Sequence, residues 1–524
     1  MVAKINSAQI VGLKTDIIEV EVDINRGLQS FNIVGLPDKA IAEAKDRINS
    51  AIKNSGFKAP QKGNKKVIVS LAPANLRKEG STFDLAIALG YLLSAGEIKF
   101  DPRQKLFVGE LALDGSLRPI AGALLIAQKA KDRGFTEIYL PAENAVEAAL
   151  IRGLTIYPCQ TLKELTNHLL AQKPTSKTLG ADGEIYELRK ITPVKETQII
   201  ITDHNYTFDF AEIRGQQTAK RGLEIAAAGG HNVAMYGPPG TGKTMLARAF
   251  TAIMPPLGIE EVIEVTGIHS ATGFLVEDLI THPPFRSPHH TSSYVSLVGG
   301  GTWPKPGEIT MAHRGVLFLD EFPEFDKKVI EALRQPLEDK VISVARARGS
   351  MIFPASFILV AALNPCPCGF RGSRVKECTC TQSQIQKYSR KISGPIIDRI
   401  DIWLDVPQIK HEELSNNKPA GESSQKIRER VLGARNRQNK RFVNIKNIST
   451  NGEMGVKELK KYAPLSDSSS KLLNDSAKRL NLSARAYHRI IKLARTIADL
   501  ADVPDIQDQH LLEALQYRPK NIFE

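Results

Sequence analysis

The sequence predicts an α/β protein of two or three domains. Three observations support that prediction. In two separate stretches of the 524-residue chain, short apolar runs typical of buried strands alternate with segments of helical period. Between these stretches, residues 169–208 are rich in small and turn-forming residues, as is typical of a linker. In residues 409–524 the helical period dominates.

Residues 1–168 are predicted to form the first α/β domain. Apolar residues recur in short β-rich runs, and the runs are separated by segments in which they recur at helical spacing. The predicted strands are residues 17–24, 31–34, 67–69 and 137–140, and the predicted helices are residues 37–55, 83–93 and 121–134.

A phosphate-binding loop is predicted in the second α/β domain, residues 209–408. An apolar strand ends at Tyr236 and a helix follows the loop, which is the context that this motif requires. The loop residues are Gly237, Pro238, Pro239, Gly240, Thr241, Gly242, Lys243 and Thr244. Glycines let backbone N–H groups face phosphate oxygens, and the helix N-terminus adds partial positive charge. Lys243 is expected to reach the β- and γ-phosphates and Thr244 to ligate Mg²⁺, so ATP and Mg²⁺ are the predicted cofactors.

Two acidic residues follow a second apolar strand. Asp320 and Glu321 come directly after Val316–Leu319. The carboxyl ends of parallel strands meet at one edge of a sheet, so both acids are expected beside the phosphate-binding loop. Asp320 is then predicted to hold Mg²⁺ and Glu321 to polarise the attacking water. The alternative is a strand that ends in ordinary surface acids.

Together these motifs resemble those of AAA+ ATPases. Asn364, which closes the next apolar strand, matches the polar sensor-1 residue of that family. The segment around Arg399 resembles the one that carries the arginine finger, and Arg485 resembles the sensor-2 arginine at a helix start. The resemblance implies catalytic roles for all three residues, a helical lid over residues 409–524, and a homo-hexameric ring in which Arg399 completes a neighbouring site. The alternative for both arginines is an ordinary place at a helix end.

Several further segments resemble the magnesium-chelatase-like ATPases. They are residues 284–291, 299–301, 306–309, 312–321, 333–338 and 364–369. Within that group, the chain resembles the ComM (YifB) family over nearly its full length. This resemblance implies a DNA helicase that migrates three-stranded branches during recombination in natural transformation. Its implied partners are single-stranded and branched DNA, with recombination proteins.

The first domain is similar to the Lon protease domain. The similarity lies in residues 109–122 and 140–144. Ser81 or Thr82 falls near the place of the Lon serine, whereas Leu124 stands at the place of the lysine. An aliphatic side chain cannot accept the proton of the nucleophile, so no peptidase activity is expected. Ring assembly or DNA guidance is the expected role.

The charge balance makes a polyanion a plausible partner, with DNA or RNA before a membrane; the alternative is that the protein is basic for no specific reason, as many soluble proteins are. Lys and Arg exceed Asp and Glu by 70 − 57 = 13 residues. Arg346 and Arg348 lie in a predicted hairpin, residues 341–354, and are expected to contact DNA phosphates without reading bases. A solvated hairpin tip is the alternative. The loop that contains His289 and His290 is a second candidate for DNA contact, and a metal site at this histidine pair is disfavoured.

Four of the five cysteines lie within fifteen residues. Cys366, Cys368, Cys378 and Cys380 form two close pairs, which suits tetrahedral Zn²⁺ in a reducing compartment. The C-x-C spacing is tighter than the usual C-x₂-C spacing. The alternative is a set of reduced thiols that pack a loop.

The remaining composition excludes several classes. No apolar run is long enough to span a membrane and the first residues contain no apolar signal core, so a cytoplasmic protein is expected. The leading prediction is an ATP-dependent DNA motor. The runner-up is the motor subunit of a metal-chelatase complex. A protease is disfavoured by Leu124, and a non-hydrolysing scaffold by the presence of Asp320, Glu321 and Asn364.

Overall fold

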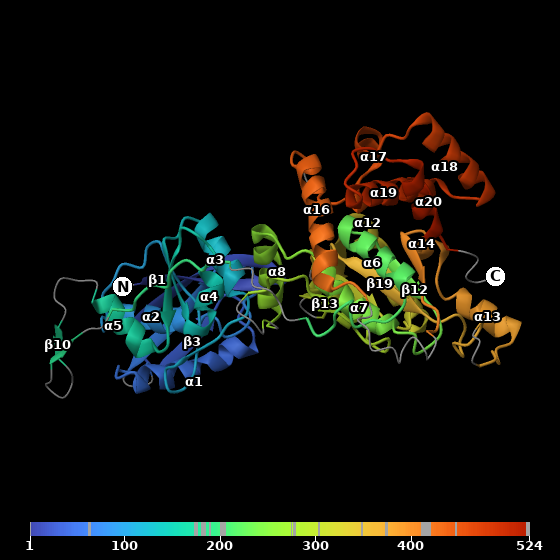
Figure 1. The fold of residues 1–524 in the computed structure, drawn as a ribbon. Helices are drawn as coiled ribbons and strands as arrows, with labels where there is room; N and C mark the ends of the chain where they lie inside the picture. The colour runs from blue at the N-terminus through green and yellow to red at the C-terminus, as the bar shows by residue number, and fades with distance from the viewer. Residues whose placement is uncertain are drawn as a thin grey trace. The chain divides into compact units, whose positions relative to one another are not determined.

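The computed structural model divides the chain into two compact units. The first consists of Met1–Ile200 and Ile259–Ile280, and the second of Ile201–Gly258 and Thr281–Glu524. The described residues are 2–60, 64–171, 177–179, 185–187, 190–199, 206–273, 275, 279–301, 304–346, 349–372, 376–409, 421–445 and 448–519. Figure 1 traces both units along the chain. In this described part, no helix is both long and apolar enough to cross a membrane.

A seven-stranded mixed sheet forms the centre of the first unit, in the order β3-β4-β2-β1-β5-β8-β9. The strands are β1 (Ala3–Val11), β2 (Lys14–Arg26), β3 (Ser30–Val34), β4 (Lys65–Ala72), β5 (Lys105–Phe107), β8 (Glu137–Pro141) and β9 (Thr155–Cys159). The β1–β2 and β2–β4 pairs are antiparallel, and the other pairs are parallel. All four predicted strands are confirmed. β1, β5 and β9 were not predicted.

Helices contribute to two hydrophobic cores in this unit. They are α1 (Lys39–Asn54), α2 (Asp84–Ser94), α3 (Ala123–Asp132), α4 (Ala145–Ala148) and α5 (Leu162–Leu170). One core takes residues from α1, α2 and α5, and the other takes residues from α3 and α4. The three predicted helices correspond to α1, α2 and α3. Leu124, at the lysine's place in the Lon comparison, is buried in the second core.

A helix from the middle of the sequence joins the first unit. α8 (Ile259–Thr272) packs on α3 and lies beside it in Figure 1. The Gly122 N–H donates to the Ser270 carbonyl at 2.9 Å, and the Ser270 hydroxyl donates to Glu147 at 2.5 Å. Residues 209–408 were expected to form one ATPase core. The structure instead groups Ile259–Ile280 with the first unit.

Part of the predicted linker, residues 169–208, packs on the first unit. Ile191 is buried in the core that α1, α2 and α5 share, and its N–H donates to His168 Nδ1 at 2.9 Å. The Val194 N–H donates to the Ile156 carbonyl of β9 at 2.9 Å. The short strands β10 (Lys177–Leu179) and β11 (Ile185–Glu187) pair with each other. The residues between 172 and 176 and between 180 and 184 lie outside the described part of the chain.

The second unit contains a five-stranded parallel sheet in the order β13-β16-β19-β12-β20. The strands are β12 (Val233–Tyr236), β13 (Phe285–Arg286), β16 (Val316–Leu319), β19 (Ile358–Leu363) and β20 (Ile402–Asp405). Every residue of β16 and β19 is buried, as expected for central parallel strands. Because all five strands run the same way, their carboxyl ends lie at one edge of the sheet.

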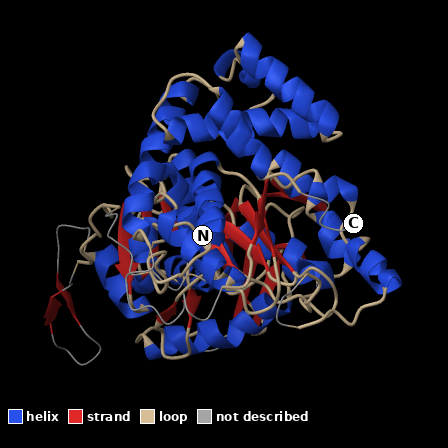
Figure 2. Cartoon of the chain, turned by 45° about the vertical axis from the view of Figure 1, so that its right-hand side comes forward, coloured by secondary structure: helices blue, strands red, loops and turns tan. Residues whose placement is uncertain are grey.

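The helices that follow the sheet share its hydrophobic core. They are α16 (Ser424–Phe442), α17 (Val456–Tyr462), α18 (Asp467–Arg479), α19 (Ala484–Leu500) and α20 (Asp508–Gln516). α16 and α19 pack on α6 (Gln217–Gly229), and one continuous cluster contains apolar residues from these helices and from the strands. Figure 2 shows the helical character of this region. The predicted helical content is confirmed.

Candidate nucleotide site

The predicted phosphate-binding loop connects β12 to α7 (Lys243–Ile253). Gly240 and Gly242 have φ of +74° and +90°, which L side chains rarely adopt, and no heavy atom lies within 4 Å of a Cβ built on either residue. At Gly237 a Cβ would stand 2.2 Å from the Val406 carbonyl oxygen, so the close approach of the two backbones requires glycine. The loop therefore has the curled backbone and the open side that a triphosphate needs.

Lys243 lies in the first turn of α7 and is largely buried. Its Nζ donates to the carbonyls of Gly237 at 2.6 Å and Pro238 at 2.7 Å, and to Asn364 Oδ1 at 3.2 Å. Burial lowers the pKa of Lys243 to about 8, although the charges of Asp320 and Glu321 oppose that shift. The ammonium is thus held in the loop by neutral acceptors that phosphate oxygens are able to replace.

Thr244 and Asp320 meet at the edge of the sheet. The Thr244 hydroxyl donates to Asp320 Oδ2 at 2.8 Å, and the Glu321 N–H donates to Asp320 Oδ1 at 2.9 Å. Hydroxyl and carboxylate oxygens are hard donors that suit Mg²⁺. Glu321 has a φ of +50°, a conformation uncommon for residues other than glycine and concentrated at functional sites. The residues present therefore fit Mg²⁺ with a nucleotide phosphate chain.

Asn364 follows β19 and lies beside the loop. The Gly237 N–H donates to the carbonyl of Leu363 at 3.2 Å, which ties the start of the loop to the end of this strand. With Asn364 Oδ1 accepting from Lys243, the ends of β12, β16 and β19 converge as the sequence predicted. The catalytic roles of these residues remain predictions.

His290 contacts Glu321, a relation that the sequence analysis missed. The His290 Nδ1 lies 3.3 Å from Glu321 Oε2, and the rings of His289 and His290 lie 4.2 Å apart between centroids. From the sequence, His290 is a candidate only for DNA contact, and a metal site at the His289–His290 pair is disfavoured. No sequence signal links it to Glu321, because 31 positions separate the two residues and only the folded loop brings them together.

Arg399 and Arg485 meet on Glu338. Arg399 is nearly buried, donates to the Pro395 carbonyl at 2.7 Å and forms an ion pair with Glu338. Arg485, in the first turn of α19, lies 3.4 Å from the other oxygen of the same carboxylate. The two arginines lower the pKa of Glu338. Within one chain the two arginines are therefore joined to each other through Glu338. At the phosphate-binding loop, by contrast, the joined residues are Thr244 and Asp320.

The predicted hairpin is confirmed as β17 (Val341–Arg346) paired with β18 (Gly349–Pro354). Arg346 is the last residue of β17 and stands opposite Gly349. Arg348 lies outside the described residues. The expected contact of both arginines with DNA remains a prediction.

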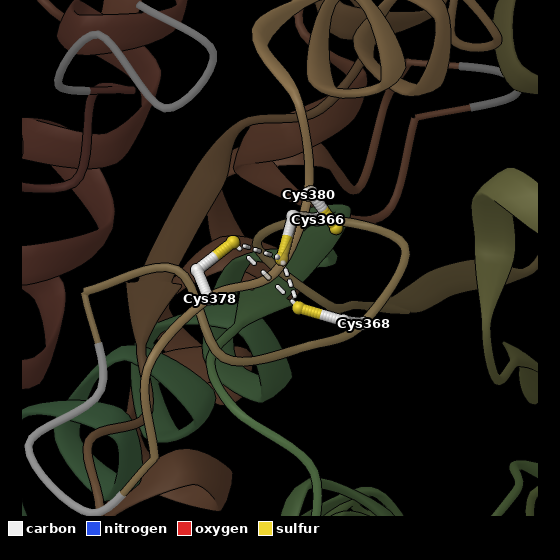
Figure 3. A group of neighbouring side chains, drawn as sticks. All are labelled: Cys366, Cys368, Cys378 and Cys380. Atoms are coloured by element: carbon white, nitrogen blue, oxygen red, sulfur yellow. Dashed lines mark hydrogen bonds between the residues drawn. The ribbon is translucent and has the colours of Figure 1, made fainter.

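The four clustered cysteines converge in space, as Figure 3 shows. The Cys366 Sγ lies 3.3 Å from that of Cys368 and 3.6 Å from that of Cys378, and all four sulfurs lie within 4.8 Å of one another. All four are free thiols. A backbone hydrogen bond from Phe370 lowers the pKa of Cys368 to about 6. This group is able to hold a metal ion.

Family models cover most of the chain. The model described as "Subunit ChlI of Mg-chelatase" matches residues 20–144, "Magnesium chelatase, subunit ChlI" matches residues 209–414, and "Magnesium chelatase, subunit ChlI C-terminal" matches residues 421–518. The competence protein ComM of Haemophilus influenzae is 42% identical, with 98% of this chain and 97% of the relative covered. The chain belongs to the ComM/YifB family.

Two further relatives are similar in sequence to this ComM/YifB protein. The protein YifB of Salmonella typhimurium is 38% identical, with 98% of this chain and 97% of the relative covered. Lon protease 2 of Bacillus subtilis is 28% identical over 188 residues, which is 34% of each chain. The predicted fold class, a Lon-like α/β domain with an AAA+ core and a helical C-terminal region, is confirmed. Family membership also places the chain among AAA+ ATPases, whose cofactors are ATP and Mg²⁺.

Proposed function

We propose that this protein is a ring-forming motor that couples ATP hydrolysis to movement along DNA. One observation carries the ATPase part of the proposal. The loop Lys243, the Thr244 hydroxyl, the Asp320 carboxylate and the Asn364 amide come from three strand ends and are joined by hydrogen bonds. Phosphoryl transfer depends mainly on positioning and charge stabilisation, and this group supplies both.

Each residue has a defined part in the proposed reaction. Lys243 binds the β- and γ-phosphates, and Thr244 and Asp320 hold Mg²⁺, which neutralises charge on the phosphate oxygens. Glu321 accepts a proton from the attacking water, and Asn364 orients that water. Arg399 stabilises the γ-phosphate in a neighbouring subunit's site, and Arg485 acts on the γ-phosphate in the sensor-2 role.

Three observations support DNA as the partner. The chain has a formal net charge of +13, which favours a polyanion. Arg346 lies at the turn end of the β17–β18 hairpin, and an arginine in such a loop is suited to contact the phosphates of a DNA backbone. A relative that aligns with this chain over 97% of the relative's length is named a competence protein. We therefore propose single-stranded and branched DNA as substrates of branch migration in recombination during natural transformation, by a hexamer acting with recombination proteins.

The cofactors of the proposed motor are ATP, Mg²⁺ and Zn²⁺. The first two belong to the site around Lys243. For the cysteine cluster we propose Zn²⁺, because its four sulfurs lie within 4.8 Å of one another and four cysteine ligands are a typical zinc set.

A metal-chelatase motor is the second candidate function. It is favoured by the three family models, each of which carries the name of a magnesium-chelatase subunit. Such a motor would hydrolyse ATP for a partner complex and would have no need of DNA. The response of ATP turnover to DNA therefore separates the two candidates.

The deciding experiment measures ATP hydrolysis by the full chain with and without single-stranded DNA at low salt, where phosphate contacts are strongest. We expect strong stimulation by DNA. Glu321→Gln should lower turnover by about 10²–10⁴-fold while nucleotide still binds, because it removes the proton acceptor. Glu324→Gln is the matched control, since Glu324 pairs with Lys391 on the surface. Turnover that ignores DNA would favour the chelatase-type motor.

A further inference from the structure

The sulfur geometry of the cysteine cluster matches a four-thiolate metal site. Zn–S bonds of about 2.3 Å in a tetrahedron place sulfurs about 3.8 Å apart. The described separations, from 3.3 Å to at most 4.8 Å, bracket that value. They exceed the length of a disulfide bond, which is about 2.05 Å. The cluster is therefore arranged for a shared ion and not for a covalent pair.

Packing of reduced thiols does not account for this arrangement. Only Cys366 is buried, and the other three cysteines are partly exposed. Backbone N–H groups also hydrogen-bond to the sulfurs: those of Phe370 and Thr379 to Cys368, and that of Cys380 to Cys378. Amide donors to sulfur stabilise thiolates and orient metal ligands. Partly exposed sulfurs that accept backbone hydrogen bonds are a poor apolar filler for a loop and suit metal ligands better.

The first cysteine pair belongs to a tight turn that packs on the phosphate-binding loop. The Gly369 N–H donates to the Cys366 carbonyl at 2.9 Å, and Gly369 has a φ of +84°. A Cβ on Gly369 would stand 2.7 Å from Pro239 Cδ, so the turn lies directly against the loop. The position of the Cys366–Gly369 turn thus affects Pro239, in the part of the phosphate-binding loop that precedes Gly240 and Gly242.

The same turn begins two residues after Asn364. Asn364 accepts from Lys243 through its side chain, and its backbone N–H hydrogen-bonds to Tyr388 of α13 (Gln382–Ser389). Cys380 immediately precedes the Thr381 cap of α13. The first cysteine pair therefore follows Asn364 closely in the chain, and the second pair directly precedes the helix whose Tyr388 contacts Asn364.

We propose that Cys366, Cys368, Cys378 and Cys380 bind one Zn²⁺ that fixes the Cys366–Gly369 turn, and that the fixed turn positions Pro239 and Asn364 for nucleotide. The zinc ion is structural, since four protein ligands leave no open position for chemistry. The link to nucleotide rests on the proposed ATP site, whereas zinc binding itself does not.

The test begins with metal content. The full chain, purified in the presence of zinc, should contain about one Zn²⁺ per chain by mass spectrometry, as expected for a closed tetrahedral site. Loading the metal-free chain with Co²⁺ should produce the visible absorption of tetrahedral cobalt thiolate. Cys378→Ser should lose both signals, and Cys159→Ala, which removes the cysteine of the first unit, should keep them. A wild-type chain that takes up neither metal overturns the site, and iron in place of zinc overturns the identity of the ion.

The link to nucleotide is tested by titrating a fluorescent ADP analogue into zinc-loaded and zinc-stripped wild-type chain. We expect affinity to fall by roughly tenfold on stripping and to return when zinc is restored, because displacement of a positioning group by about 1 Å has large effects. Gly369→Ala should keep zinc yet weaken nucleotide binding. Unchanged affinity after stripping would overturn the link. A zinc-loaded wild-type chain that binds no nucleotide would instead overturn the proposed ATPase function and leave the metal site standing.

Discussion

The Lys243 ammonium donates to two loop carbonyls and to Asn364, so its charge is already compensated in part before nucleotide arrives. Burial nonetheless lowers its pKa to about 8. A triphosphate favours the charged form, so nucleotide binding raises this pKa again. Proton uptake and nucleotide binding are therefore coupled at this residue.

That coupling predicts a pH dependence for nucleotide affinity. Below about pH 8, Lys243 of the nucleotide-free chain is already protonated, so the affinity for nucleotide should not change with pH. Above about pH 8, the Kd for nucleotide should rise by up to about tenfold per pH unit, because Lys243 must take up a proton when nucleotide binds. Calorimetry in two buffers of different ionisation enthalpy should show net uptake near pH 9. Lys243→Arg is the control, since a guanidinium does not titrate there and the slope should vanish. A flat profile for the wild-type chain would contradict the lowered pKa.

The contact between His290 and Glu321 predicts a positioning role for the histidine. His290→Ala should lower ATP turnover by about tenfold, because Glu321 then loses the partner that orients its carboxylate, and should leave nucleotide Kd within about twofold. Steady-state kinetics beside nucleotide titration separates the two effects. His290→Gln, which keeps a hydrogen-bond donor, should restore part of the turnover. Equal ATP turnover in the alanine variant and the wild type would show that His290 has no positioning role toward Glu321.

Among the elements, the β17–β18 hairpin is a two-stranded antiparallel ribbon whose sequence contains Arg346 and Arg348. Replacing Arg346 and Arg348 together by alanine should weaken single-stranded DNA binding and reduce the slope of log K against log salt by about 1.4, or roughly 0.7 for each phosphate that is no longer neutralised. Fluorescence anisotropy at several salt concentrations measures this slope. DNA-free ATP turnover should be unchanged.

The control for the hairpin removes equal charge elsewhere. Lys478 and Arg479 are exposed at the end of α18, and their double alanine variant should keep the wild-type salt slope. If both double variants reduce the slope equally, binding follows net charge alone and the hairpin has no special part.

Elements also differ in how well the sequence predicts them. β16 and β19 are continuous apolar runs, and such runs identify central parallel strands. β1 was missed because polar residues interrupt its apolar positions, and pairing with β2 along nine positions defines it. The membership of α8 in the first unit was beyond prediction, since its helical pattern does not specify the surface on which it packs.

At the scale of the whole molecule, the proposed ring requires Arg399 to act across a subunit boundary. Within one chain this arginine is nearly buried against Glu338. The Lys243→Ala and Arg399→Ala variants should each be inactive alone. When they are mixed in equal amounts, about a quarter of the sites should become active, because half of the subunits keep Lys243 and half of their neighbours keep Arg399. ATP turnover of the mixture measures this restoration. Inactive mixtures of folded variants, checked by thermal unfolding, would assign Arg399 to the ion pair within its own chain.

Short-range sequence signals were enough to predict the phosphate-binding loop, the acids after β16, the polar residue after β19 and the cysteine pairs. Each of these signals is local, since it consists of residue types at fixed short spacing beside a strand. Three relations emerge only from the folded chain: His290 faces Glu321, Arg399 and Arg485 share Glu338, and Gly369 packs on Pro239. These relations join positions far apart in the chain, and only the packing of loops at the sheet edge determines which side chains meet.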